Sequence, residues 1–259
     1  MSYIRYAAGI DSGSAFCKGA LLLDAGAGVR IEKLFVIPSG WNTRETGVTA
    51  RDALFAAVPR AAPRPVPLIA TGYGRARIEG SRKTITEISA HAAGAQFLYP
   101  GVKTLIDIGG QDCKVITLEE GRVLEFLMND KCAAGSGRFL EAVAARLGAD
   151  SAMVETLLAA GRSAALNSTC VVFAESEITA LIAQGVSREA ILGGAADAMA
   201  ARIGALAARL SLAEPAALSG GLSESAGIAK TLSRALGILV RPLERGIYAG
   251  AIGAALKGF

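Results

Sequence analysis

The stretch Ile10-Asp11-Ser12-Gly13 ends a run of strand-forming residues, and the pattern returns later as Ile106-Asp107-Ile108-Gly109. Cys17-Lys18 and Cys113-Lys114 follow at the same offsets from the two aspartates. Asp, Gly, Cys and Lys at matched spacings indicate that one α/β unit has been duplicated. Each copy is too small to enclose a ligand, so we expect the pair to form a cleft.

The residues around each hairpin predict the same order of elements twice. We expect strands at 3–10, 17–23, 31–37 and 68–70 and helices at 44–58 and 84–97 in the first copy. Strands are expected at 104–108, 114–118, 123–128 and 216–218 in the second copy, which otherwise turns mostly helical. The boundary is placed at Tyr99-Pro100-Gly101, giving domains 1–99 and 100–259.

The composition excludes several classes of protein. The chain has 259 residues, a formal charge of +4 and only 5% aromatic residues, and its Lys and Arg are spread evenly. We therefore expect no nucleic-acid partner. The start of the sequence lacks the pattern of a signal peptide, and no uncharged apolar run approaches the ~18 residues of a membrane span. We expect a cytoplasmic protein without membrane contact, in which cysteines are thiols or metal ligands.

The first hairpin has the chemistry of a phosphate-binding turn. A strand that ends in Asp and turns through Gly and Ser frees backbone N–H groups and hydroxyls for phosphate oxygens. Ser12, Gly13 and Ser14 fit this role, with Lys18 on the returning strand. One such turn alone is usually only a turn, and it is the matched pair that favours function.

The second hairpin repeats this logic with closer backbone approach at Gly109 and Gly110. Asp11 and Asp107 could hold Mg²⁺ through water, and Gln111 could orient the attacking water, which makes these three the candidate catalytic residues. A third glycine pair, at Gly220 and Gly221, follows the strand expected at 216–218. It suits close approach to a nucleoside, although a plain strand-to-helix turn is an equal alternative.

The order of these three elements resembles the actin-like ATPase superfamily over nearly the whole chain. The resemblance implies an α/β fold with two ribonuclease-H-like domains around an ATP cleft. It also implies that ATP, ADP and Mg²⁺ are the ligands of the paired hairpins.

Two of the four cysteines, Cys132 and Cys170, lie just before expected helices. A helix start stabilises the thiolate, which is the form that binds soft metals. The alternative for each position is a buried, inert cysteine. A [4Fe–4S] cluster usually takes four Cys ligands, which a homodimer could supply on its two-fold axis. A single-chain site with all four cysteines is the rival, but Cys17 and Cys113 fit better as small packing residues.

With these motifs, the chain resembles the ATP-dependent activators of 2-hydroxyacyl-CoA dehydratases. It is also similar to the related reductases of benzoyl-CoA-reductase and double-cubane-cluster systems. The stretches that carry the resemblance are 9–14, 71–75 (Thr-Gly-Tyr-Gly-Arg), 86–89, 106–112, 128–141, 169–177 and 249–256. The family implies a homodimer with one bridging [4Fe–4S] cluster held by Cys132 and Cys170. It also implies a ferredoxin or flavodoxin as electron donor and a partner iron–sulfur enzyme as acceptor.

Some positions depart from the family pattern, among them Ala15, Cys17, Ser219 and Ile247. They affect the expected details of nucleotide binding and leave the cysteine motifs intact. Two other functions remain open from the sequence. One is a small-molecule kinase without a cluster, and the other is a nucleotide-switched filament or interaction protein. The acceptor enzyme is also left open.

Overall fold

A computed structural model describes residues 4–63, 65–166 and 171–259. The chain divides into two compact units. Met1–Gly101, Glu119–Val123 and Arg245–Phe259 form the first unit, and Val102–Leu118 and Leu124–Glu244 form the second. The sequence predicts a single domain boundary between residues 99 and 100. In the structure, Glu119–Val123 and Arg245–Phe259 also belong to the first unit.

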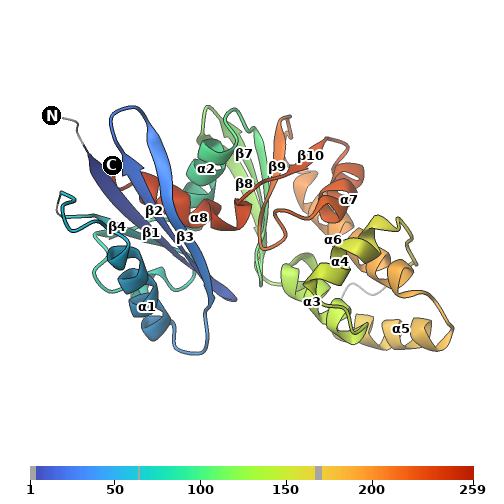
Figure 1. Ribbon diagram of the computed structural model, residues 1–259. Coiled ribbons are helices and arrows are strands. Elements are labelled where there is room, and N and C mark those ends of the chain that lie inside the picture. The colour runs from blue at the N-terminus through green and yellow to red at the C-terminus, as the bar shows by residue number, and fades with distance from the viewer. Residues whose placement is uncertain (1–3, 64, 167–170) are drawn as a thin grey trace. The chain divides into compact units, whose positions relative to one another are not determined.

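The first unit is built on a five-stranded sheet in the order β3-β2-β1-β4-β5 (Figure 1). Its strands are β1 (Arg5–Ser12), β2 (Phe16–Asp24), β3 (Val29–Pro38), β4 (Leu68–Thr71) and β5 (Lys83–Thr84). The first three strands pair in antiparallel fashion, and β4 lies parallel to β1. The β-branched and aliphatic runs of β1, β2 and β4 supply the buried faces of this sheet.

Helices cover both faces of the first sheet (Figure 1). Helix α1 (Thr43–Ala56) packs on one face through Ala50 and Leu54. Helices α2 (Glu87–Leu98) and α8 (Ala249–Leu256) lie on the other face, where Ile252 packs against Ala20 and Leu22 of β2. The short η1 (Arg75–Arg77) and η3 (Gly246–Tyr248) connect the elements of this unit. The result is a sheet buried between two helical layers.

The second unit repeats the same sheet, with the order β10-β9-β6-β7-β8. Its strands are β6 (Thr104–Ile108), β7 (Cys113–Glu119), β8 (Arg122–Asn129), β9 (Ala216–Gly220) and β10 (Val240–Pro242). Strand β6 pairs antiparallel with β7 and parallel with β9, just as β1 pairs with β2 and β4. The predicted duplication of a ribonuclease-H-like unit is thus confirmed by strand order and direction.

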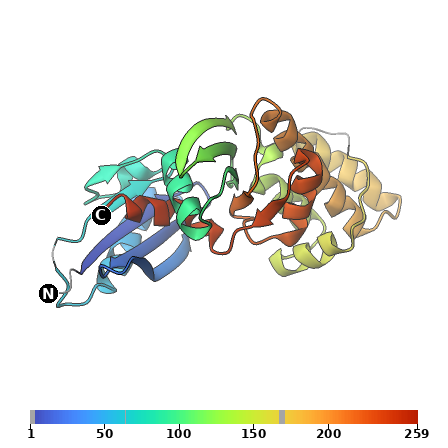
Figure 2. The ribbon, with the colours of Figure 1, turned by 90° about the horizontal axis from the view of Figure 1, so that it is seen from above.

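Helices gather beside the second sheet and are most easily followed in Figure 2. They are η2 (Ala133–Gly135), α3 (Gly137–Arg146), α4 (Ser151–Ala159), α5 (Val171–Ala183), α6 (Arg188–Ala207) and α7 (Ala226–Leu236). Helix α6 is the centre of this group and packs against α3, α4, α5 and α7. Its buried stripe includes Ile191, Leu192, Met199 and Ile203. In length and composition α6 could cross a membrane, but more than half of its apolar window is buried, as expected of a core helix.

Candidate functional site

The first hairpin joins β1 to β2 and holds a partly buried ion pair. Asp11 lies directly across from Lys18 in the antiparallel ladder, and the Lys18 Nζ is 3.3 Å from the Asp11 Oδ2. The Gly13 N–H donates to the Phe16 carbonyl over 3.1 Å and closes the turn. Gly13 and Ser14 are partly exposed at the tip, whereas Ser12 is buried. The structure therefore brings the predicted residues of this hairpin together.

Two helices of the first unit complete the surroundings of Asp11. The buried His91 on α2 places its Nε2 4.0 Å from the Asp11 Oδ2. On α8, a Cβ at Gly250 would lie 2.9 Å from the same oxygen and 2.8 Å from the His91 Nε2. Only glycine leaves room for the aspartate at this position of α8.

The second hairpin joins β6 to β7 and carries the equivalent pair in a more buried setting. The Lys114 Nζ is 3.4 Å from the Asp107 Oδ2 and 2.7 Å from the Asp112 Oδ2. The Ser219 hydroxyl, at the end of β9, donates to the Asp107 Oδ1 over 2.8 Å. Lys114 therefore lies between two carboxylates, and one of them also accepts a hydrogen bond from a neighbouring strand.

The glycines of the second unit have different surroundings. Gly220 has a φ of +86° and lies so close to the Ile108 carbonyl that no side chain could fit there. The Gly221 N–H donates to that carbonyl over 3.0 Å, although Gly221 itself is exposed. Gly109 and Gly110 are half-buried in the turn, and Gln111 is exposed at its tip. The third glycine pair thus packs directly against the second hairpin.

Backbone hydrogen bonds tie the second hairpin to the start of α3. The Gly137 N–H donates to the Gly109 carbonyl over 2.8 Å, and the Arg138 N–H donates to the Gly110 carbonyl over 3.2 Å. The first N–H groups of a helix have no partner within the helix, and here the hairpin supplies two acceptors. A shift of this turn must therefore move the first turn of α3.

Cys132 lies just before α3 and is half-buried. The Arg202 guanidinium on α6 donates to its Sγ over 3.2 Å. The Asn129 side chain donates to the Cys132 carbonyl over 2.9 Å and fixes the loop. Neighbouring side chains therefore contact both the sulfur and the carbonyl of Cys132.

Cys17 and Cys113 differ sharply from Cys132. Both are fully buried free thiols. Burial, reinforced by the nearby Asp11 carboxylate, raises the pKa of Cys17 to about 12. Burial likewise raises the pKa of Cys113 to about 11, and the Asn129 N–H offsets part of this effect. Neither thiol ionises near neutral pH, as expected of packing residues.

Comparison with known proteins identifies the chain at the family level. The family model described as the BadF/BadG/BcrA/BcrD ATPase family matches residues 8–258. The chain belongs to this family of ATPases.

Three proteins match this family member along almost its whole length. It is 42% identical over 257 residues to the uncharacterized protein YjiL of Escherichia coli, covering 98% of this chain and 97% of that protein. It is 37% identical to the (R)-2-hydroxyglutaryl-CoA dehydratase activating ATPase of Acidaminococcus fermentans, with coverage of 98% and 97%. The ADPNP-bound activator of the 2-hydroxyisocaproyl-CoA dehydratase from Clostridium difficile superposes with a TM-score of 0.88 at 34% identity, covering 98% and 94%. The predicted resemblance and the actin-like ATPase fold are confirmed.

The cysteine pair of this BadF/BadG/BcrA/BcrD ATPase is only partly described by the structure. Cys170 lies outside the described residues, immediately before α5. Among the described residues, His, Cys, Asp and Glu side chains form no group of three or more that could hold a metal ion. A cluster with four Cys ligands is therefore not completed by the described part of one copy. Cys132, which is half-buried and accepts a hydrogen bond from the Arg202 guanidinium, could supply one thiol ligand.

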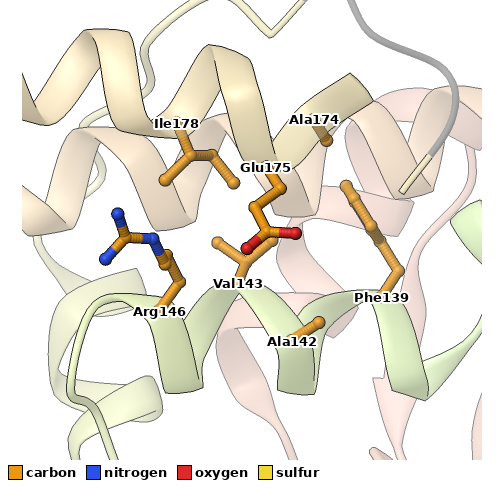
Figure 3. Close-up of a pocket in the computed structure, with 7 residues that line it drawn as sticks. All are labelled: Phe139, Ala142, Val143, Arg146, Ala174, Glu175 and Ile178. Atoms are coloured by element: carbon orange, nitrogen blue, oxygen red, sulfur yellow. The ribbon is translucent and has the colours of Figure 1, made fainter. Parts of the chain in front are cut away.

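A cavity of about 260 Å³ lies between α3 and α5, the helices that follow Cys132 and Cys170 (Figure 3). Its wall is mostly apolar, and the Glu175 carboxylate points from α5 toward α3. The lining residues are Phe139, Ala142, Val143, Arg146, Ala174, Glu175 and Ile178.

Several residues of the site were not foreseen from the sequence. In the sequence, Ser219 indicates only the start of a glycine-containing turn. Arg202 lies within a mostly apolar helix that does not point to a site. A polar residue in the middle of such a helix is the signal that could have pointed to it. The structure also buries His91 beside Asp11. Gly250 lies within residues 100–259, which the sequence predicts as the second domain, whereas the structure places it in the first unit.

Proposed function

We propose that this ATPase is an activator that uses ATP hydrolysis to supply a low-potential electron to a partner iron–sulfur enzyme. The acceptor would be of the 2-hydroxyacyl-CoA dehydratase or the double-cubane-cluster type. The observation that carries the proposal is the hydrogen bonding of the second hairpin to α3, which is separated from Cys132 by the short helix η2. The full-length similarity to two dehydratase activators supports it.

The hairpins would bind the phosphates of ATP and ADP. In the first, Gly13 and Ser14 are accessible at the turn, and Ser12 would contribute through its backbone. Lys18 is close enough to the surface to reach a phosphate oxygen while remaining near Asp11. In the second, Gly109 and Gly110 allow close approach of the backbone.

The two aspartates would act on the metal and the water. Each carboxylate lies beside a lysine, and carboxylate oxygens are ligands that can hold Mg²⁺ through water. Gln111 is exposed at the tip of its turn, where its side chain is free to orient the attacking water. Gly220 and Gly221 would form the surface near the nucleoside, with Gly221 the accessible member of the pair.

Coupling would pass from the phosphates to the cysteine loop through the backbone. A change in the Gly109-Gly110 turn alters the acceptors of the Gly137 and Arg138 N–H groups, and so the first turn of α3. Cys132 precedes this turn and is held by Asn129. Loss of the γ-phosphate would in this way reposition the cysteine loop.

Cys132 and Cys170 from two copies would hold one [4Fe–4S] cluster in a homodimer. When bound, such a cluster stores one electron at a low potential, which a ferredoxin or flavodoxin could supply. The Arg202 guanidinium would donate to the Cys132 sulfur, and hydrogen bonds to a ligating sulfur tune the potential.

The test is the iron content of anaerobically purified protein. We expect about four iron atoms per dimer, since the proposed cluster contains four. Cys132→Ser and Cys170→Ser should lose this iron, whereas the matched control Cys17→Ser, a buried thiol in the first unit, should keep it. Full iron in both ligand variants would overturn the proposal. Iron-free wild-type protein whose ATP turnover depends on a small-molecule substrate would point to a kinase instead.

A further inference from the structure

Three loops lie at one edge of the first sheet. Strands β1, β3 and β4 run in the same direction, because β2 is antiparallel to both β1 and β3 and β4 is parallel to β1. The loops that follow them, 13–15, 39–42 and 72–74, therefore begin at the same edge. The first of these is the phosphate hairpin.

Hydrogen bonds attach the other two loops to the hairpin. The Ser39 hydroxyl donates to the Gly13 carbonyl over 2.7 Å, and the Ser39 N–H donates to the Ala15 carbonyl over 2.9 Å. The Gly74 N–H donates to the Ser12 carbonyl over 2.9 Å. Loops 39–42 and 72–74 are therefore in direct contact with the backbone that would hold the phosphates.

Both attached loops expose an aromatic side chain. Trp41 is 93% exposed and Tyr73 is 64% exposed, and Phe16 at the start of β2 is 39% exposed. Large exposed aromatic side chains are costly in water, and Trp and Tyr are the residues that most often anchor protein interfaces. None of the three has a role in the nucleotide or cysteine chemistry proposed above.

Three arginines and two glutamates lie around these aromatic residues. Arg44 and Glu45 lie in the first turn of α1, directly after the Trp41 loop, and Arg75 and Arg77 follow the Tyr73 loop in η1. Glu79 pairs with Arg44, but both side chains are well exposed and such a pair is weak. A surface with two exposed aromatic anchors and three arginines is complementary to an acidic protein segment.

We propose that this aromatic edge (Phe16, Trp41 and Tyr73 with Arg44, Arg75 and Arg77) is the docking surface for an acidic segment of the acceptor protein. The inference rests on the proposed function, since it names the face on which the acceptor binds. Docking moves or stiffens the loops bonded to residues 12–15. Acceptor binding is in this way sensed by the phosphate hairpin of the first unit.

The experiment uses the intrinsic fluorescence of Trp41, the only tryptophan of the chain. The probe is a short peptide of Glu residues around a central Leu, and the control peptide has Lys in place of Glu. We expect the Glu peptide to shift the Trp41 emission to shorter wavelength, with saturation and with weaker binding at higher salt. The Lys peptide should leave the emission unchanged.

Variants identify the surface independently of fluorescence, by the anisotropy of a dye-labelled Glu peptide. Arg44→Gln and Arg77→Gln should each weaken binding about three- to five-fold, and Trp41→Ala should weaken it about ten-fold or more. The matched control is Arg60→Gln, an exposed arginine that follows α1 away from this edge, and it should bind as the wild type does.

Two results would overturn the proposal. One is Glu-peptide binding that the Trp41 and Arg77 variants leave unchanged, or no binding at all. The other is a shift of the Trp41 emission by MgADP alone, with no effect of the peptide, which would make the edge a nucleotide surface. Iron content and ATP turnover are measured on the same preparation. If those two are as proposed while the peptide does not bind, only the docking inference fails.

Discussion

The two hairpins share an Asp–Lys pair across the strands and differ in how deeply that pair is buried. In each, an aspartate at the end of the first strand faces a lysine across the antiparallel ladder. The Lys18 side chain is 16% exposed and lies near the Asp11 carboxylate, whereas the Lys114 side chain is 3% exposed and lies between the carboxylates of Asp107 and Asp112. Duplication thus preserved the ion pair while its surroundings diverged.

The neighbouring parallel strand shows the same divergence. Asp11 is level with Thr71 on β4, and Asp107 is level with Ser219 on β9. The Ser219 hydroxyl donates to its aspartate, whereas the Thr71 hydroxyl donates to the Ile85 carbonyl. The second hairpin is therefore held by Lys114 on β7, by Ser219 on β9 and by its backbone hydrogen bonds to α3. A rigid turn transmits a displacement to a helix better than a loose one.

The largest expected effect is on stability. Lys114→Met would leave the buried Asp107 and Asp112 short of a counter-charge, at a cost of about 3–5 kcal/mol in the free energy of unfolding. Lys18→Met should cost about 1–2 kcal/mol, because water reaches this pair. Urea denaturation of both variants measures the difference. Equal losses would show that the two hairpins are equally constrained.

The next effect is on ATP hydrolysis. Asp11→Asn and Asp107→Asn should each lower the rate of phosphate release about 100-fold, because each removes a charge proposed to hold Mg²⁺ through water. Asp52→Asn on the exposed face of α1 is the control and should hydrolyse ATP as the wild type does. A loss in only one of the two hairpin variants would assign the metal to that hairpin alone.

A smaller effect is expected from the neighbouring hydroxyls. Ser219→Ala removes a hydrogen bond to a buried carboxylate and should lower the free energy of unfolding by about 1.5–3 kcal/mol. Thr71→Val removes only a bond to a carbonyl and should cost about 1 kcal/mol. The order would be reversed if Thr71 rather than Ser219 supported its aspartate.

The smallest effect concerns the thiols. In iron-free protein at pH 8, iodoacetamide should modify Cys132 at least about ten-fold faster than Cys17 or Cys113, as followed by mass spectrometry. The raised pKa values of the buried pair mean that the folded state holds their protons more tightly. Their contribution to stability is complete below pH 9 and falls as the pH rises toward 11 and 12. Rapid alkylation of Cys113 would contradict its assignment as a packing residue.

Much of the sheet architecture could be read from the sequence. The offsets from Asp to Lys in the two hairpins correspond to one register, because each pair lies directly opposite in its ladder. The strands expected at 104–108 and 68–70 agree closely with β6 and β4. The helix expected from Thr84 begins at Glu87, because Thr86 caps it by accepting from the Ser89 N–H.

The rest depends on contacts that are distant in sequence. Arg202 reaches Cys132 across 70 positions, and Ser219 reaches Asp107 across 112. No local pattern specifies such pairs. Helix α8 is made almost entirely of Ala and Gly, so it has no polar face to indicate which sheet it covers. The roles of the individual hairpin residues and of Cys170 stay predictions.

The position of α8 has a consequence for the order in which the protein matures during synthesis. The strands of the first sheet leave the ribosome long before residues 249–256, so the face that α2 and α8 share lacks α8 while the second unit is being translated. Gly250 packs against the Asp11 carboxylate only after α8 has been synthesised. The nascent chain can therefore complete the second unit while the first is still unable to enclose its aspartate, which delays a working nucleotide site until translation has passed α8.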